Sequence, residues 1–486
     1  MSRKAKIING SVFFVWIALI SLLLYRNYEG ATLEKTQALT GAIDKAIYWY
    51  DIYAGEKKIG FASTTHEKVG NEIIIKDERE VRVKKGSQEK VLVESMKCVS
   101  DLQYSIKSLE YGSHFKDEAG IKATGVVDSS DIIFLLESPE KRKTFKTPTN
   151  GKIFYLPTTF IPALVRQLPA SGSVFSIPII DFKDLSIRQT RVVLEEIRPV
   201  KTGINIQSLY RFRTGDAVWW SNDKGIIVKE AAPRGISFYV QPEKVAKDPS
   251  GRVLFDFTDL PVFKADKPMN NPESLSLLKV RIKGFRLSPE LYADSAITLK
   301  DDTLTIKKER TEAVRARSYK LPYPGGELAG YLSADEWVTS DYKPLLDTGL
   351  IYSRNNQFDA FRFCDFLTDY LYNLVRTRTL FALQSSRDFL NTLEGDYLER
   401  TVMFPSYARA AGLPTRIVGG LVCVHGYFYF HTWPEAWFGK WVPVDPTFAQ
   451  FPADVSHIPL KEGTLRDIIS IADDLKSINI EVLEAE

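Results

Sequence analysis

The stretch LEGDYLERTVMFPSYARAAGLPTR, residues 393–416, decides the fold of this chain. We expect a helix that starts near Glu394 and ends at residues 412–414, because glycine and proline stand there as a helix C-cap requires. Pro405 lies inside this helix and has no N–H to donate to the carbonyl of Thr401, so a kink or shift is expected at that point.

The segments on either side predict helices packed on an antiparallel sheet. Before the stretch, DAFRFCDFLTDYLYNLVR (359–376) carries apolar residues at i, i+3, i+4, i+7 and i+8 spacing, which indicates a helix with one face on a core. After it, TRIVGGLVCV, YFYFHTWPEAWF and KWVPVDPTF are typical of strands, and residues 438–440 supply a tight turn between the last two.

The order of these motifs resembles the core domain of transglutaminase-like proteins of the papain-like superfamily. Bacterial members run Gly-Asp-Cys-Thr-Glu-His-Ala, then Ala-Arg-Ala-Ala-Gly-Ile-Pro-Ala-Arg, His-Ala-Trp and Trp-Val-Pro-Val-Asp-Pro-Thr. The matching text here is GDYLERT, ARAAGLPTR, HTW and WVPVDPTF, within residues 358–460. Four separated segments agree in order and spacing, so the resemblance is specific.

The resemblance implies a nucleophile, a base and an orienting carboxylate. In the family, a cysteine at a helix N-terminus is activated by the helix dipole and a nearby imidazole, and a carboxylate orients that imidazole. By position, His431 is the base and Asp445 the orienting residue. The nucleophile position falls on Tyr397, whose phenol ionises near pH 10 and is rarely deprotonated at neutral pH.

Three departures cluster around that position. Tyr397 replaces the cysteine, Arg400 stands where the family often has histidine, and Pro405 interrupts the helix, whereas Glu399 matches the family pattern. We therefore expect His431 and Asp445 to be a remnant dyad, with the Tyr397 hydroxyl near His431 in the cleft. Glu399, Arg400, Trp433 and Trp441 are the expected cleft residues.

Other residues leave alternatives open. Cys423, on the strand that leads to His431, is a candidate displaced nucleophile, although a buried strand cysteine is usually a small hydrophobe. Cys364 is expected to be a packed thiol, and His425 and His457 to be surface or supporting residues. Asp445 also has a purely structural explanation, because Asp-Pro-Thr favours a turn.

The rest of the chain predicts an α+β protein. Residues 47–260 alternate apolar and polar side chains between turn signals such as Ala54-Gly55, which indicates antiparallel meanders. Residues 154–172 form the one apolar stretch there that fits a short helix. We expect β-rich domains at 30–150 and 151–267, linking strands at 268–350 and the transglutaminase-like core at 351–486.

The N-terminus predicts an uncleaved signal anchor in residues 1–29. Arg3, Lys4 and Lys6 precede 19 uncharged residues, Ile7 to Tyr25, which would rise about 28 Å as a helix. The positive-inside rule then places the bulk of the chain in the periplasm or outside the cytoplasmic membrane, on a single-pass anchor.

Composition narrows the function classes. Lys+Arg 64 against Asp+Glu 61 gives a net charge of +3, which argues against nucleic acid as a partner. Three cysteines without metal-ligand spacing argue against a disulfide framework or a zinc site, and no motif predicts a cofactor. Two functions remain. The one we favour is binding of a polypeptide or an envelope polymer by a catalytically degenerate domain, and the alternative is cysteine-type acyl transfer by an active enzyme.

Overall fold

The computed structural model describes residues 31–32, 45–85, 88–128, 130–139, 141–149, 153–181, 186–203, 205–249, 262–267, 269, 271–377, 383–472 and 474–486. Two compact units divide the chain: Met1–Arg198 with Ser208–Gly251, and Pro199–Gln207 with Arg252–Glu486. The expected anchor helix lies outside the described residues. None of the helices within them is both long and apolar enough to cross a bilayer.

The described part of the first unit is built on a 15-stranded sheet, antiparallel except where β1 pairs with β10. Its order is β1-β10-β11-β12-β13-β14-β15-β2-β3-β4-β5-β6-β7-β8-β9. The strands are β1 (Ala31–Thr32), β2 (Lys45–Ala54), β3 (Lys57–Val69), β4 (Glu72–Lys85), β5 (Gln88–Asp101), β6 (Ile106–Phe115), β7 (Ile121–Asp128), β8 (Asp131–Glu137), β9 (Arg142–Pro148), β10 (Val174–Asp181), β11 (Ser186–Thr202), β12 (Asn205–Thr214), β13 (Ala217–Ser221), β14 (Ile227–Ala232) and β15 (Ile236–Gln241).

The two expected β-rich domains share this one sheet. β15 pairs with β2 from Ile236↔Ala54 to Gln241↔Trp49, so hydrogen bonds run without a break between strands from both expected domains. The boundary expected near residue 150 therefore does not divide the sheet. Two helices, α2 (Pro157–Val165) and α3 (Glu243–Lys247), belong to the same unit.

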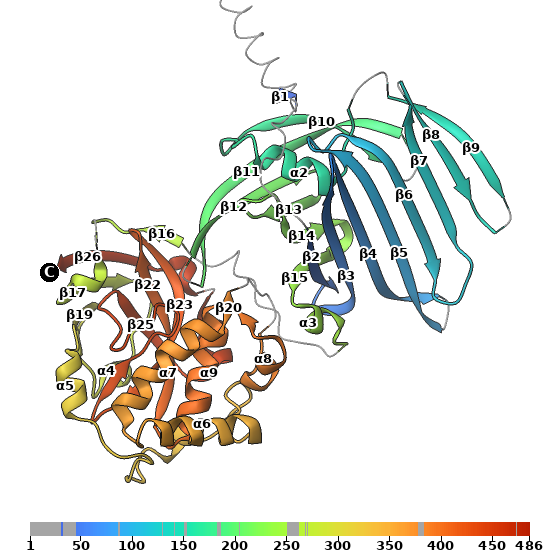
Figure 1. The fold of residues 1–486 in the computed structure, drawn as a ribbon. Helices are drawn as coiled ribbons and strands as arrows, with labels where there is room; N and C mark the ends of the chain where they lie inside the picture. Colours follow the sequence, from blue (N-terminus) through green and yellow to red (C-terminus); the bar gives the residue numbers. More distant parts are fainter. Residues whose placement is uncertain are drawn as a thin grey trace, which may run out of the picture. The chain divides into compact units, whose positions relative to one another are not determined.

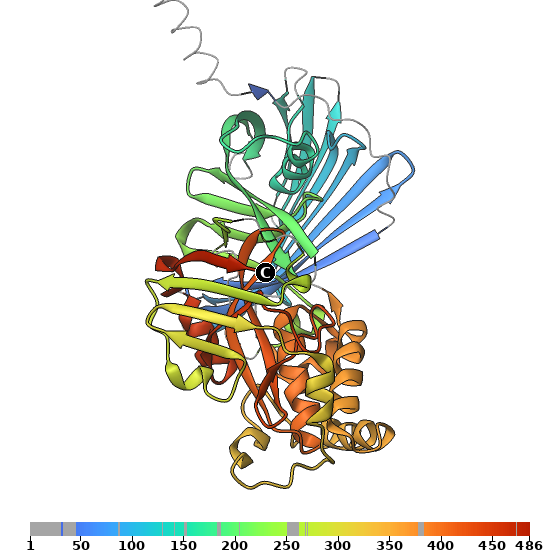
Figure 2. The same ribbon diagram turned by 90° about the vertical axis from the view of Figure 1, so that its left-hand side faces the viewer.

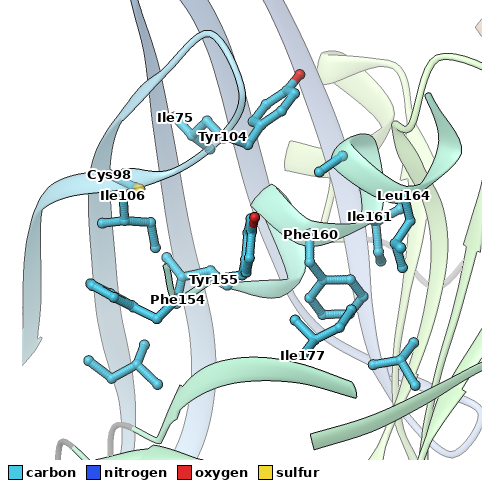
Figure 3. Close-up of a cluster of buried hydrophobic side chains, with 14 of the residues drawn as sticks. Ile75, Cys98, Tyr104, Ile106, Phe154, Tyr155, Phe160, Ile161, Leu164 and Ile177 are labelled. Atoms are coloured by element: carbon cyan, nitrogen blue, oxygen red, sulfur yellow. The ribbon is translucent and has the colours of Figure 1, made fainter. Parts of the chain in front are cut away.

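The core of the first unit forms where α2 covers the sheet. Phe160, Ile161 and Leu164 of this helix are fully buried, and they pack in one cluster with residues of β4, β5, β6 and β10. Figure 3 shows these three side chains in the same cluster as Cys98 and Ile106. The predicted short helix is thus the apolar element that buries one face of the sheet.

The second unit contains the predicted helix-on-sheet core. A sheet in the order β16-β23-β22-β25, with β24 paired to β23, is contacted by α9, and α6 and α7 pack on α9. Figure 2 shows these helices, in orange, gathered on one side of the strands. The bounds are β16 (Val262–Lys264), β22 (Thr415–Val424), β23 (Tyr427–Trp437), β24 (Trp441–Pro443), β25 (His457–Glu462), α6 (Lys343–Asn355), α7 (Ala360–Leu374), α8 (Ser386–Thr392) and α9 (Tyr397–Ala410).

The expected linking strands are also part of the second unit. They form a sheet in the order β18-β19-β17-β26, in which the C-terminal strand pairs antiparallel with β17 (Figure 1). This pairing ties residues near 280 to residues near 480. The remaining bounds are β17 (Leu277–Lys283), β18 (Ile297–Lys300), β19 (Thr303–Lys307), β20 (Arg376–Thr377), β21 (Glu394–Gly395), β26 (Asn479–Ala485), α4 (Pro289–Tyr292), α5 (Thr311–Ala316) and α10 (Leu465–Ile469).

Candidate active site

The start of α9 fixes Tyr397 at the nucleophile position. Asp396 is the N-cap: its carboxylate accepts from the N–H of Leu398 at 2.9 Å, and Glu399 Oε2 accepts from the N–H of Asp396 at 2.9 Å. This capping box makes Tyr397 the first residue of the helix. The helix runs through Pro405 without ending, as far as Ala410.

His431 and Asp445 form the expected dyad. His431, in the middle of β23, is fully buried, and its Nε2 lies 2.7 Å from Asp445 Oδ2. Asp445 Oδ1 also accepts from the N–H of Thr447 at 2.7 Å, so the turn proposed for this residue and its contact with histidine coexist. Gly420 of β22 pairs with His431 across the sheet. A Cβ on Gly420 would lie 2.0 Å from the carbonyl oxygen of Ile458, so only glycine fits at this position.

A second histidine extends the dyad into a chain of hydrogen bonds. His457 Nε2 lies 2.9 Å from Asp445 Oδ2, and its Nδ1 lies 3.1 Å from the carbonyl oxygen of Asp454. Burial alone lowers the pKa of His457, but hydrogen bonds to the Asp445 and Asp454 carboxylates outweigh it and raise the pKa to about 10. His457 is therefore an imidazolium that donates from both nitrogens.

His431 takes the opposite charge state. Burial first, and then the neighbouring Lys201, lower its pKa to about 3 in spite of Asp445, so the ring is neutral. Asp445 remains ionised: burial raises its pKa, but His431 and His457 together hold it well below its usual value. His431 then donates from Nε2 to Asp445 and presents the lone pair of Nδ1.

The amine of Lys201 is hydrogen-bonded to His431 Nδ1. It lies on the tip of the β11–β12 hairpin, in the segment Pro199–Gln207 that groups with the second unit. Its Nζ is 2.8 Å from His431 Nδ1, and the residue is 6% exposed. Gly203 lies at this tip in the left-handed region, at φ 57°. A Cβ on Gly203 would lie 2.7 Å from Cγ2 of Thr377, so a larger residue would not fit without movement.

Tyr397 packs against both groups. Its ring centroid lies 5.1 Å from that of His431 and 4.2 Å from Lys201 Nζ. Among the described residues, its hydroxyl has no hydrogen-bond partner. Burial raises the pKa of this phenol well above its ordinary value, and the Asp396 and Glu399 carboxylates add to the shift. The side chain acts as an aromatic wall and cannot serve as a phenolate.

The other expected cleft residues have different environments. Trp433 lies 6.0 Å from the His431 ring and stacks on it, as a cleft wall would. Glu399 is a capping residue, and the Arg400 guanidinium is buried and donates to the carbonyl oxygens of Asp396 and Val375. Trp441 packs on Trp437, Tyr331 and the guanidinium of Arg416.

Cys423 is poorly placed to act as a nucleophile next to His431. In the antiparallel register His431 is opposite Gly420, and Cys423 is three positions further along β22. Because neighbouring residues of a strand face opposite sides, the thiol points away from the face that carries His431. Burial also raises its pKa to about 11. Cys364 is buried in α7 with a pKa raised well above normal, and Cys98 lies in the first unit.

His431, Asp445 and His457 are also the candidate metal ligands in the described part of the chain, with ligand atoms within 4.8 Å of one another. A metal ion bound here would have to displace a proton from His457, because an imidazolium has no free lone pair. The hydrogen bonds and charges of the three side chains account for their clustering.

A family comparison identifies the domain that contains these residues. Residues 354–446 match the Transglutaminase-like superfamily. They form a transglutaminase-like domain. The matched segment contains α7, α9, Tyr397, His431 and Asp445. No curated protein matches the chain.

Solved structures give weaker likenesses. A beta-barrel-like protein with a domain of unknown function from Brucella abortus shares 13% identity at a TM-score of 0.32, over 40% of this chain and 94% of its own. A proposed cysteine protease from Cytophaga hutchinsonii shares 14% identity at a TM-score of 0.27, over 46% and 82%. Likeness at this level carries no conclusion about function.

Sequence reasoning left His457 open between the surface and a supporting role, and it missed Lys201. His457 supports the site by balancing the charge of Asp445. Lys201 gave no signal, because it precedes Tyr397 by 196 positions, in a β-rich region, and only the hairpin turn at Gly203 marks its surroundings. A lysine next to such a turn is ordinary in sequence.

Proposed function

We propose that the transglutaminase-like domain does not catalyse cysteine-type acyl transfer and instead acts as a binding or scaffold module for a polypeptide or an envelope polymer. One observation carries this: Lys201 Nζ occupies His431 Nδ1, the lone pair with which a base would accept a proton from its nucleophile. Tyr397 fills the space beside it, and the orientation of Cys423 opposes the alternative of a displaced thiol.

A groove beside the remnant offers a surface for such a partner. Its volume is about 780 Å³, and it is lined by described residues between Lys264 and Glu273, by residues 422–426 at the end of β22, and by residues between Phe448 and His457. Phe448 and His457 line the groove and also contact the His431 ring, at centroid distances of 5.5 and 5.9 Å. A ligand in the groove would therefore lie next to the dyad.

We also propose that the segment Ile7 to Tyr25 holds the chain to the cytoplasmic membrane with its bulk in the periplasm or outside. Nineteen uncharged residues after three basic ones support this. Protease added to spheroplasts should digest the protein. Full protection until the membrane is lysed would contradict this placement.

Cysteine reactivity tests the absence of catalysis. The full chain is treated with iodoacetamide from pH 5 to 9, and each cysteine is followed by peptide mass spectrometry, with His431→Ala alongside. We expect slow alkylation of all three cysteines in both proteins, because the buried thiols stay protonated. Fast reaction of Cys423 below pH 8 that depends on His431 would establish the enzyme instead.

Binding is tested separately at the groove. Sedimentation with purified peptidoglycan and fluorescence anisotropy with an unfolded polypeptide report the two partner classes. Lys264→Glu reverses a charge on the groove wall, and Lys300→Glu reverses an exposed charge on β18 that does not line it. Binding that Lys264→Glu weakens and Lys300→Glu leaves unchanged supports the proposal. No binding to either class, or equal effects of the two variants, argues against it.

A further inference from the structure

The inner face of the sheet in the first unit changes from apolar to polar along β4. Ile73 and Ile75 belong to the core cluster that α2 covers. Alternate residues of a strand share a side, so Asp77 and Arg79 continue the same face. Asp77 is only 4% exposed. A buried carboxyl next to an isoleucine core is unfavourable unless its charge and hydrogen bonds are satisfied.

Neighbouring elements complete a polar cavity around Asp77. Thr64 of β3 pairs with Asp77, and its Oγ1 donates to Asp77 Oδ1 at 2.6 Å. His66 lies two residues further along β3 and is 5% exposed. With these side chains, Glu230 of β14 and Thr158 of α2 line a cavity of about 40 Å³. All of these residues belong to the first unit.

Three polar atoms that line the cavity have no hydrogen-bond partner in the described part of the chain. They are Asp77 Oδ2, His66 Nδ1 and Thr158 Oγ1, and each atom is buried. Burial lowers the pKa of His66 to about 4, so its ring is neutral and can accept a hydrogen bond. A carboxylate oxygen also accepts, and a hydroxyl can do so. A ligand with several N–H donors would therefore satisfy all three atoms.

The charges around the cavity are unbalanced as well. Its lining contains two carboxyl groups, Asp77 and Glu230, and one guanidinium, that of Arg79, which lies 4.9 Å from the Phe238 ring centroid. Burial raises the pKa of Asp77, and the Thr64 hydrogen bond and the charge of Arg79 oppose that rise. A second cation in the cavity would balance the two carboxylates.

Size and access restrict that cation. A volume of 40 Å³ has room for about three water molecules, at about 15 Å³ each. A guanidinium is a planar group of this size with N–H donors along its edges. Arg79 and Glu230 are partly exposed, so the cavity is reached from solvent on their side.

We propose that this cavity binds a guanidinium group, whose N–H groups donate to Asp77 Oδ2, His66 Nδ1 and Thr158 Oγ1. A small guanidinium compound and the arginine side chain of a polypeptide both supply this chemistry. The site goes beyond the proposed function, because it lies in the first unit and does not involve the transglutaminase-like domain or its groove.

Calorimetric titration of the full chain tests the charge requirement. Methylguanidinium and N-methylurea have nearly the same shape, but only the first is a cation. At constant ionic strength we expect methylguanidinium to bind at least about tenfold more tightly, because its hydrogen bonds to a carboxylate are charge-assisted. Equal affinities, or no binding of either compound, would overturn the proposal and leave a cavity that holds water only.

Variants on β4 locate the binding. Asp77→Asn keeps the shape of the side chain and should weaken methylguanidinium binding about tenfold or more, because the carboxylate is lost. Glu78→Gln removes the neighbouring carboxylate, which is exposed on the other face of β4, and should have no effect. Equal effects would refute the site. Thr158→Val, which removes one acceptor without a change of charge, should also weaken binding and serves if Asp77→Asn does not fold.

Competition distinguishes the two sources of the group. A short peptide with one arginine should displace methylguanidinium if the site takes a side chain, and the same peptide with citrulline should not. Methylguanidinium binding that the arginine peptide leaves unchanged would assign the site to small compounds.

The groove variant separates this inference from the proposed function. Lys264→Glu should leave methylguanidinium binding unchanged, since Lys264 does not line the cavity. A change in this variant would place the binding in the groove and overturn the assignment to the first unit. Failure of the groove to bind a polymer would refute the proposed function and leave the guanidinium site untouched.

Discussion

Removal of Lys201 or His457 should change the pH dependence of stability in opposite directions. Burial first lowers the pKa of Lys201, and although Asp445 and Asp396 oppose this, the value falls from 10.5 to about 7. The unfolded chain then holds the proton more tightly between pH 7 and 10.5, so this residue makes stability rise with pH. His457, raised from 6.5 to about 10, holds its proton in the folded state and makes stability fall with pH from 6.5 to 10.

The two effects should nearly cancel in the wild type. Between pH 7.5 and 8.5 each group contributes about one proton of difference, which is about 1.4 kcal/mol per pH unit, with opposite signs. Relative to wild type, the stability of Lys201→Met should therefore fall by about 1.4 kcal/mol over that unit, and that of His457→Gln should rise by a similar amount. Other titrating groups are common to all three proteins and drop out of the difference.

Protection of a buried thiol from alkylation measures the pH dependence of stability for the second unit alone. Cys364 is fully buried in α7, and its alkylation in urea reports opening of the unit that contains Lys201 and His457. The free energy of opening is compared at pH 7.5, 8.0 and 8.5 for the three proteins. Parallel profiles, or slopes of the same sign in both variants, would refute the charge states assigned to Lys201 and His457.

Four further substitutions, at three residues, test the packing of the site, all followed by Cys364 protection. Asp445→Asn should destabilise the second unit by about 3–5 kcal/mol, because it leaves the buried His457 imidazolium with one carboxylate fewer; a loss below ~1 kcal/mol would contradict the ion pairing. Tyr397→Phe should change stability by less than ~1 kcal/mol, since the hydroxyl is unpaired in the described structure. Tyr397→Ala should cost about 3–5 kcal/mol through loss of the ring, and equal effects of the two Tyr397 variants would argue against the wall role. Gly420→Ala should prevent normal assembly of β22 with β25, because its Cβ would lie 2.0 Å from a backbone oxygen; wild-type protection would show that the strands can separate there.

The sequence predicts local structure where one physical signal dominates. The helix of residues 359–376 is found as α7, Ala360–Leu374, because only one of its faces is buried and apolar periodicity records that. The helix at 393–416 is found as α9, but its buried residues cover the whole circumference from Tyr397 to Ala408. Periodicity is therefore silent for α9, and its glycine and proline stop signals carry the prediction.

The site is predictable only as far as local motifs reach. His431 and Asp445 lie in short strand motifs whose order indicates the dyad. Lys201 reaches them through a hairpin far away in the chain, and His457 acts through a carboxylate it shares with His431. Such partners depend on tertiary packing, which no spacing rule encodes. The β15–β2 pairing, which joins strands from the two predicted β-rich segments, is long-range in the same way.

The antiparallel pairing of β22 with β25 bears on how this protein is handled in the laboratory. A fragment cut to residues 354–446 would keep β22 and β23 but lack β25 on one side and β16 on the other. The edge of β22, and the part of the β23 edge that β16 covers, would then present unsatisfied N–H and C=O groups, and such bare edges promote intermolecular association. Insoluble material from that fragment would report exposed edges and would say nothing about the stability of the intact fold. A longer fragment that contains residues 262–486 retains every strand partner of this sheet. Joining residues 199–207 to it also keeps Lys201 next to His431.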